Sequence, residues 1–335
     1  MKHVLLGGIA AVTMLGGGLA APAAASTPVE DAADYCVDTA SHTAKVPKGT
    51  SMWRDPDNLT VQQAQTMEFQ SNRILARAGL DASARRPNGS VKISVTFHVV
   101  TNKEGKGWVS KSRIQRQIRV LNRAFGGRTS PVASNTPFRF KLKAITHTKK
   151  TNWYSANPFA KRGVERLKNM QKALRVGGSM HLNVYTVGFH GGSLLGYASF
   201  PTDYILTPKL DGMVLWDETL PGGDAEFESS DGDVVTYNRG DTATHEVGHW
   251  MYLHHPFIGG CSYPNDYVAD TPPQDDGANT FDCGRKNNNT CGPRPDPVHN
   301  FMNYGDDICL DRFTRDQRQR MNQGWRIRQA LSSLH

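Results

Sequence analysis

The chain has 335 residues, of which 38% are hydrophobic, and carries a formal net charge of +8. This length allows one large domain or two modest ones, with a sizeable core. After the N-terminal 25 residues no apolar stretch reaches the roughly 18 residues that a membrane-spanning helix needs, which argues against an integral membrane protein.

The first residues predict a secretory signal peptide. Lys2 and His3 precede an apolar run from Val4 to Ala20, and an A-x-A sequence ends at Ala25. A membrane anchor is the alternative, but the glycines within the run and the small residues after it argue against one. We therefore expect residues 1–25 to be removed and the protein to be secreted.

Residues 26–88 differ in composition from the rest of the chain and predict a propeptide or N-terminal extension. This segment begins rich in Ala, Asp, Thr and Pro and then contains one helical stretch near Val61 to Ala78. It ends in the basic, turn-prone sequence ARRPNGS at 84–90, which is typical of a linker or a processing site.

Residues 89–335 alternate between strand and helix patterns and predict one catalytic domain. Apolar residues at every second position indicate strands, and apolar residues three or four apart indicate helices. The expected strands are VKISVTFHVV, FRFKLKAIT, HLNVYTV, LLGYASFP and DGMVLW, and the expected helices are SRIQRQIRVLNRAF and VERLKNMQKAL. The order β-α-β-α-β-β-β predicts an α/β fold with a mixed sheet.

From Gly259 to Asp311 the sequence has little periodicity and contains four of the five cysteines. A loop region of this length in a compact domain needs disulfides or a function to hold it. Secretion makes disulfides the expected state of Cys261, Cys283, Cys291 and Cys309, although spacing alone leaves three pairings open.

The C-terminal segment predicts a helix that begins at a capping box, Thr314 with Gln317, and runs towards Leu331. It contains most of the densest basic cluster: Arg312, Arg315, Arg318, Arg320, Arg326 and Arg328. No motif for reading RNA or DNA accompanies the cluster. We expect a solvated basic helix face, with neither nucleic acid nor a membrane as a partner.

The stretch THEVGHWMYLHHPF, residues 244–257, contains a candidate zinc site. His245 and His249 are four residues apart, so a helix directs both imidazoles from the same face. Glu246 lies beside the first histidine, where it can act as general base on a water that the zinc activates. The spacing H-E-x-x-H therefore predicts metal-assisted hydrolysis.

His255 is the expected third ligand, but an uninterrupted helix would place it about 80° off the ligand face and about 15 Å along the axis from His245. The chain must therefore turn after about residue 251, and Pro256 prevents a helix from continuing through His255. The adjacent His254 is the alternative third ligand. The remaining histidines have no metal partners in the sequence pattern.

With these residues in place, the chain resembles the pappalysin branch of the metzincin peptidases. HEVGHWMYLHH is similar to the metzincin signature H-E-x-x-H-x-x-G-x-x-H. The resemblance covers roughly residues 90 to 325. It includes LLGYASFP, DGMVLW, GGC, VADTP, NFMNY and FTRDQRQRM in this order, which is more specific than the zinc motif alone.

The resemblance implies a fold and a set of roles. The fold is a metzincin-like α/β catalytic domain, in which a mixed twisted sheet and an active-site helix lie above a loop-rich, disulfide-held C-terminal subdomain, with the zinc cleft between. Its implied metal ligands are His245, His249 and His255, with Glu246 as catalytic base. Met302 would lie beneath the metal and Tyr304 would stabilise the oxyanion.

The resemblance also implies the disulfides Cys261–Cys291 and Cys283–Cys309. It implies protein or peptide substrates, which would bind extended along LLGYASF as an added edge strand. Calcium is a candidate structural ion.

The chain departs from the signature at one position, where Tyr252 replaces the usual glycine of the turn. A residue other than glycine at positive φ costs roughly 1 kcal/mol or more. Either Tyr252 adopts that conformation or the turn lies at a neighbouring residue.

Two rival functions remain. A gluzincin-like peptidase would need a glutamate ligand downstream, and the chain has no Glu after residue 246. A non-catalytic secreted zinc-binding protein would need a closed site with four ligands, whereas the sequence offers three and a glutamate placed as a base.

Cys36, the fifth cysteine, lies in ADYCVDTA within the N-terminal extension. One hypothesis is that its thiolate fills the open zinc position and keeps the enzyme latent until cleavage near Arg85 and Arg86. The alternative is a free or intermolecularly paired cysteine.

Overall fold

The computed structural model describes residues 59–189, 194–228, 234–275, 283 and 289–333, and the backbone of 43–45. The chain divides into two units, Met1–Thr39 and Ala40–His335, and all described residues belong to the second. The predicted signal peptide and Cys36 lie outside the described residues. Among the helices that are described, none combines the length and apolar character needed to cross a membrane.

A mixed six-stranded sheet forms the centre of the second unit, as the sequence predicts. Four neighbouring strands run parallel, while β5 is antiparallel to both β6 and β1. In spatial order the strands are β1 (Thr43–Lys45), β5 (Gly196–Ala198), β6 (Met213–Trp216), β4 (Leu182–Val187), β2 (Val91–Thr101) and β3 (Phe138–Lys149). The inner strand β2 is buried on both faces from Val95 to Thr101. Its buried polar residues form side-chain hydrogen bonds, Thr96 with His181, and His98 with Thr146 and Asn183.

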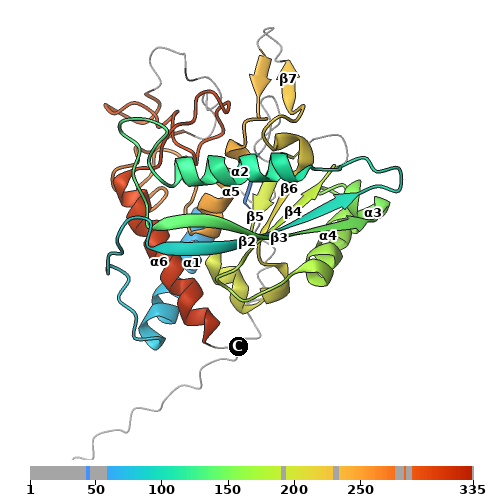
Figure 1. Cartoon of the computed structure of the whole chain (residues 1–335). Coiled ribbons are helices and arrows are strands. Elements are labelled where there is room, and N and C mark those ends of the chain that lie inside the picture. Colours follow the sequence, from blue (N-terminus) through green and yellow to red (C-terminus); the bar gives the residue numbers. More distant parts are fainter. Residues whose placement is uncertain are drawn as a thin grey trace, which may run out of the picture. The chain divides into compact units, whose positions relative to one another are not determined.

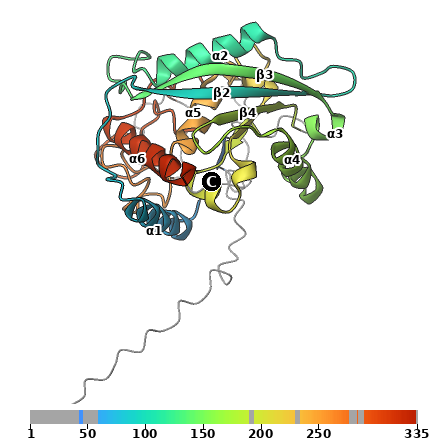
Figure 2. The ribbon, with the colours of Figure 1, turned by 60° about the horizontal axis from the view of Figure 1, so that its bottom comes forward.

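Helices cover both sides of the sheet. Figure 2 shows α2 (Lys111–Ala124) on one side of β2 and β3, and α4 (Lys161–Leu174) and α6 (Arg315–Ser332) on the other. Ser110 caps α2, and the periodic residues Ile114 and Leu121 face the core, where they join the main hydrophobic cluster with Val247 of α5 (Asp241–Trp250). Short elements complete this part: α3 (Thr151–Tyr154), η3 (Pro201–Ile205), η4 (Pro208–Leu210) and η5 (Asp217–Thr219).

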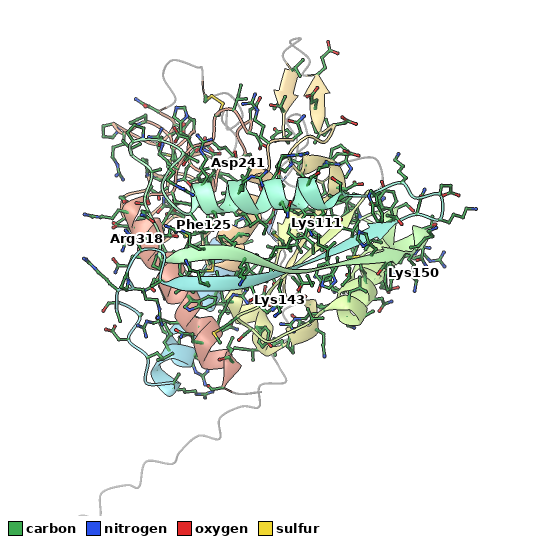
Figure 3. The ribbon with its side chains drawn as sticks, viewed as in Figure 1. Lys111, Phe125, Lys143, Lys150, Asp241 and Arg318 are labelled. Carbon is green, nitrogen blue, oxygen red and sulfur yellow. A yellow bond between two sulfur atoms is a disulfide. The ribbon has the colours of Figure 1, made fainter. Side chains whose placement is uncertain are left out.

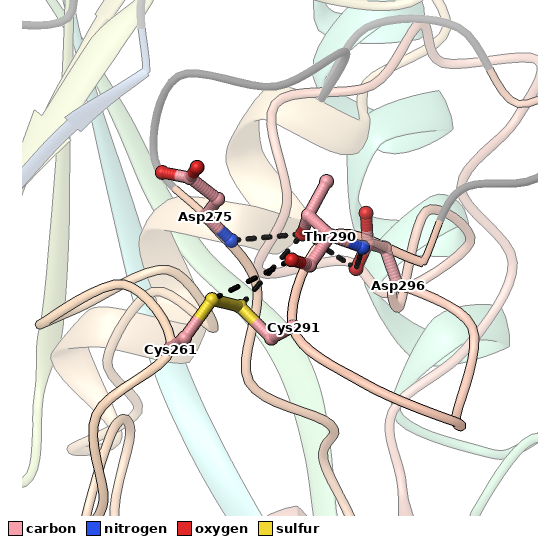
Figure 4. The surroundings of a disulfide bond; sticks show 5 residues. All are labelled: Cys261, Asp275, Thr290, Cys291 and Asp296. Carbon is pink, nitrogen blue, oxygen red and sulfur yellow. Dashed lines mark hydrogen bonds between the residues drawn. A yellow bond between two sulfur atoms is a disulfide. The ribbon is translucent and has the colours of Figure 1, made fainter.

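Beyond α5, loops and two disulfides replace regular structure, as expected. The pairings Cys261–Cys291 and Cys283–Cys309, implied by the resemblance, are confirmed. Around the first disulfide, Thr290 accepts a hydrogen bond from the Asp275 backbone N–H at 3.0 Å and donates one to Asp296 at 2.9 Å (Figure 4). Before α5 the chain also forms a hairpin that the sequence pattern does not predict, β7 (Glu226–Glu228) with β8 (Val234–Thr236).

The N-terminal extension contains the predicted helix α1 (Val61–Arg77), which begins with a capping box of Thr60 and Gln63. Figures 1 and 2 both show α1 beside α6. Met67 and Leu75 of α1 share a hydrophobic cluster with Ile327 and Leu331 of α6. This part of the extension therefore packs directly on the helix that ends the chain.

The expectation of a solvated basic face on the C-terminal helix is wrong for two of its arginines. Arg320 is 6% exposed and Arg328 is fully buried, because each forms an ion pair with a carboxylate from a distant part of the chain. Arg315, at the start of α6, is exposed as expected. Further exposed basic charge lies on other elements, for example at Lys111 of α2, at Lys143 of β3 and at Lys150 just after it (Figure 3).

Candidate metal centre

Helix α5, which carries the H-E-x-x-H sequence, is anchored at its N-terminus by side chains from other elements. Asp307 accepts hydrogen bonds from the backbone N–H groups of Arg239 at 2.9 Å and Asp241 at 3.3 Å. Gln117 of α2 donates to the carbonyl of Gly240 at 2.8 Å. A carboxylate at this end also interacts favourably with the helix dipole. These contacts fix where the helix begins and so fix the direction of its histidines.

The structure brings the three predicted histidines together. The Nε2 atoms of His245 and His249 are 2.9 Å apart, and the Nε2 atom of His255 lies 3.1 Å from each of them. Nitrogen ligands of a tetrahedral zinc, with Zn–N bonds of about 2.0–2.1 Å, lie about 3.3 Å from one another. In the described part of the chain this is the one group of three such side chains with metal-binding geometry. The donor set therefore fits zinc.

Backbone carbonyls orient two of these rings. The Nδ1–H of His245 donates to Phe301 O at 2.8 Å, and the Nδ1–H of His249 donates to Leu253 O at 2.7 Å. Each bond fixes the tautomer that leaves the Nε2 lone pair available for a metal. Burial lowers the pKa of His249 to about 3, which keeps this ring in the neutral form that binds metal.

The turn that returns His255 to the helix is centred on Tyr252. The helix ends at Trp250, and Tyr252 has a φ of 81°. Its N–H donates to His249 O at 2.8 Å, and the N–H of Leu253 donates to Gly248 O at 2.9 Å. This pair of hydrogen bonds is the Schellman motif, whose left-handed position is usually glycine. Tyr252 itself therefore adopts the conformation that the signature reserves for glycine.

The structure also separates the two candidates for the third ligand. His254 lies on the other side of the turn, with its Nε2 3.6 Å from the carboxylate of Glu68 and its ring 5.2 Å from that of Phe200. The ring of His255 points instead to His245 and His249.

Glu246 is fully buried beside strand β5. A side chain added at Gly196 would place its Cβ 3.2 Å from Glu246 Cγ and 2.9 Å from Leu215 Cδ2. Glycine at this position lets the strand approach Glu246 closely. The predicted substrate strand and the predicted base are therefore neighbours.

The segment NFMNY, residues 300–304, lies beneath and beside the histidines. Met302 is buried against α5, where a Cβ on Gly248 would lie 2.2 Å from Met302 Sδ. The ring of Tyr304 lies 4.8 Å from that of His255 and 5.9 Å from that of His245. The roles that the resemblance implies for these two residues stay predictions.

Sequence reasoning missed several residues that support the centre. Asn300 and Gln317 exchange two amide hydrogen bonds, and Asn300 also accepts from the N–H of Met302 at 2.9 Å. Phe301 orients His245 through its backbone carbonyl, and the pattern of side chains in a sequence does not indicate such a contact. Gly248 could have been found from the sequence, because a glycine inside a helix costs about 1 kcal/mol of stability and so indicates a close contact at that position.

Curated proteins resemble this chain in sequence. The family described as Peptidase_M43, pregnancy-associated plasma protein-A, matches residues 230–325. Extracellular metalloprotease 1 of Coccidioides posadasii is 36% identical over 259 residues, which cover 75% of this chain and 82% of that protein. An extracellular metalloprotease of Neurospora crassa is 36% identical over 254 residues, which cover 73% of this chain and 78% of that protein.

Solved structures show the same relationship. Mature mirolysin of Tannerella forsythia, in complex with a cleaved peptide, has a TM-score of 0.59 and 28% identity, and the match covers 73% of this chain and 97% of mirolysin. A promirolysin variant has a TM-score of 0.60 and 26% identity, with 85% of this chain and 96% of the precursor covered. These matches define the class: the protein is a metalloendopeptidase with the mixed α/β fold of the metzincins. Within that class, the chain belongs to the pappalysin family, Peptidase_M43.

Proposed function

We propose that the protein is a secreted zinc endopeptidase, in which His245, His249 and His255 hold the metal and Glu246 is the general base. The observation that carries this proposal is the convergence of three buried Nε2 atoms at 2.9–3.1 Å, two from the H-E-x-x-H helix and one from the chain just beyond it. Enzymatic relatives favour this function over a non-catalytic zinc-binding protein. The names of the relatives support secretion.

In the proposed reaction, bound zinc supplies Lewis acidity to the scissile carbonyl and makes a water molecule more acidic. The carboxylate of Glu246 takes a proton from the attacking water and returns it to the nitrogen of the leaving amine. The hydroxyl of Tyr304, next to His255, donates a hydrogen bond to the oxyanion as it forms. No covalent enzyme intermediate is needed.

The substrate would bind extended along β5, as an additional strand at the sheet edge. In the structure β1, from the N-terminal extension, pairs antiparallel with β5 at this edge, with Thr43 opposite Ala198 and Lys45 opposite Gly196. A strand of the extension on this edge supports the assignment of residues 26–88 as a propeptide or N-terminal extension, whose strand β1 would block the substrate, and of residues 89–335 as the catalytic domain. The promirolysin match, which covers more of this chain than mature mirolysin does, agrees with that role.

A structural calcium ion is proposed for the loop after the third histidine. Asp266 is fully buried there, and burial raises its pKa to about 8. Its Oδ1 accepts from the N–H of Val268 at 3.0 Å, and a side-chain hydrogen bond with Thr271 partly offsets the rise in its pKa. The buried Oδ1 of Asp270 accepts no hydrogen bond. Carboxylate oxygens are the ligands that calcium prefers. Calcium should raise the melting temperature of the wild type but not of Asp266→Asn.

The experiment that tests the catalytic proposal is digestion of a peptide library by the purified, matured protein and by its Glu246→Ala variant, with zinc analysis of both. The proposal expects one zinc per chain in both proteins and cleavage only by the wild type. Equal cleavage by the two proteins would contradict the role of Glu246.

A further inference from the structure

Helix α6 holds the end of the active-site helix through three residues spaced four apart. Arg328 Nε donates to Trp250 O, and Arg320 Nε donates to Tyr252 O, each at 2.9 Å. Between them, a Cβ on Gly324 would lie 2.3 Å from Met251 O. One face of α6 therefore contacts three consecutive residues of the turn, with two cations at the negative end of α5.

Each of these arginines is itself fixed by a buried carboxylate. Arg328 Nη1 donates to Asp211 Oδ1 at 2.9 Å, and Arg320 Nη2 donates to Oε1 of Glu68. Burial acts to raise the pKa of Glu68, but the neighbouring His254 and the charge of Arg320 lower it to about 2, so Glu68 is charged. Asp211 lies within the catalytic domain, whereas Glu68 belongs to α1 of the N-terminal extension.

Helix α1 also contacts Tyr252 directly. The tyrosine hydroxyl donates to Met67 O at 3.0 Å, and the guanidinium of Arg320 lies 4.4 Å over the tyrosine ring. Tyr252 is the residue with φ at 81°, between His249 and His255. The strained turn is therefore held from one side by α6 and from the other by α1.

The segment after α1 is attached to α6 as well. Asn322 donates to Ala84 O, and Arg86 donates to Gln329 Oε1 at 2.6 Å. A processing protease needs an extended, accessible segment, and these contacts oppose release of residues 84–86 from α6. They favour a catalytic domain that keeps α1.

We propose that Glu68 is a positioning residue of the metal centre and that α1 remains bound to the catalytic domain in the active enzyme. Glu68 fixes Arg320, Arg320 fixes Tyr252 O, and the turn at Tyr252 sets the position of His255 relative to His249. In this proposal, maturation either removes only the residues that precede α1, or cuts the chain near Arg85 and Arg86 and leaves α1 bound to the catalytic domain as a separate fragment. This inference rests on the proposed zinc ligands.

The first test measures zinc affinity by chelator competition in the full chain, for wild type, Glu68→Gln, Glu68→Asp and a control, Gln70→Ala, at an exposed position of the same helix. We expect Glu68→Gln to weaken zinc binding at least tenfold and to change the visible absorption spectrum of the cobalt-substituted protein. Glu68→Asp should recover part of the affinity, and Gln70→Ala should match wild type. Wild-type affinity and spectrum in Glu68→Gln would overturn the inference, whereas failure of wild type itself to bind zinc would refute the proposed ligands.

The second test needs no variant. Matured, active wild-type enzyme is isolated by size exclusion under native conditions, and its fragments are weighed by denaturing mass spectrometry. Residues 61–77 should be present in a one-to-one ratio with the catalytic domain. Fully active enzyme without residues 61–77 would overturn the inference.

Discussion

Restoring the glycine of the metzincin signature should destabilise this protein. Tyr252→Gly would relieve the left-handed backbone strain, a gain of about 1 to 2 kcal/mol. The tyrosine side chain, however, is fully buried, contacts Arg320 and donates a hydrogen bond to Met67 O. Removal of a large buried aromatic side chain costs about 3 to 5 kcal/mol. The loss exceeds the gain, so we expect a net decrease of about 1 to 4 kcal/mol in the free energy of unfolding.

The assay is urea unfolding at fixed zinc concentration, in the Glu246→Ala background so that the chain cannot digest itself. The control is Tyr252→Phe, which keeps the backbone conformation and the packing and loses only the hydroxyl. It should cost about 1 kcal/mol. If Tyr252→Gly proves as stable as the parent, or more stable, strain outweighs side-chain packing at this turn and the reasoning is refuted.

The same geometry predicts three further outcomes. Chelation should abolish proteolysis and added zinc should restore it. Zinc analysis should find the His255→Ala variant depleted of zinc and the His254→Ala variant fully loaded. The reverse result would make His254 the third ligand. Because the pKa of Glu68 is lowered from 4.5 to about 2 in the folded state, its stabilisation is complete above pH 4.5 and is lost as the pH falls towards 2. The difference in unfolding free energy between wild type and Glu68→Gln should therefore shrink by up to about 3 kcal/mol over this range, and a pH-independent difference would contradict the assignment. Replacing Cys261 and Cys291 by serine should lower the free energy of unfolding by about 3 to 4 kcal/mol, and unchanged urea midpoints would show that the loop is held without the disulfide.

The regular elements could be predicted because their burial is periodic along the sequence. Strands β2 and β3 and helices α2 and α6 appear where alternation, helical spacing or capping residues indicate them. The strands β1, β7 and β8 could not be predicted, because three residues show no measurable period. Strand β5 is equally short, but it was expected within the longer apolar segment LLGYASFP. Their formation depends on the partner strand, as with β1 on β5.

Much of the site could be predicted from local spacing. His245 and His249 are related by one helical turn, and Pro256 shows that the helix must have ended. The conformation of Tyr252 could not be decided from the sequence, since it depends on contacts with α1 and α6 as well as on the residue itself.

The role of the C-terminal arginines could not be predicted either, because it depends on contacts with residues that are distant in the sequence. Arg320 and Arg328 look like part of a solvated basic face, and only their partners show otherwise. Glu68 is 252 positions away from Arg320, and Asp211 is 117 positions away from Arg328. Pairings at such separations are set by tertiary structure. The disulfide connectivity likewise came from family resemblance, because the spacing of four cysteines leaves three pairings open.

The most direct test of the central claim is peptide hydrolysis by matured wild type and Glu246→Gln, compared at equal zinc content. Glutamine preserves the shape of the side chain but cannot accept the proton of the attacking water. The account predicts one zinc per chain in both proteins and a kcat/KM lower in the variant by about 100-fold or more. Equal kcat/KM values in two fully zinc-loaded proteins would contradict it.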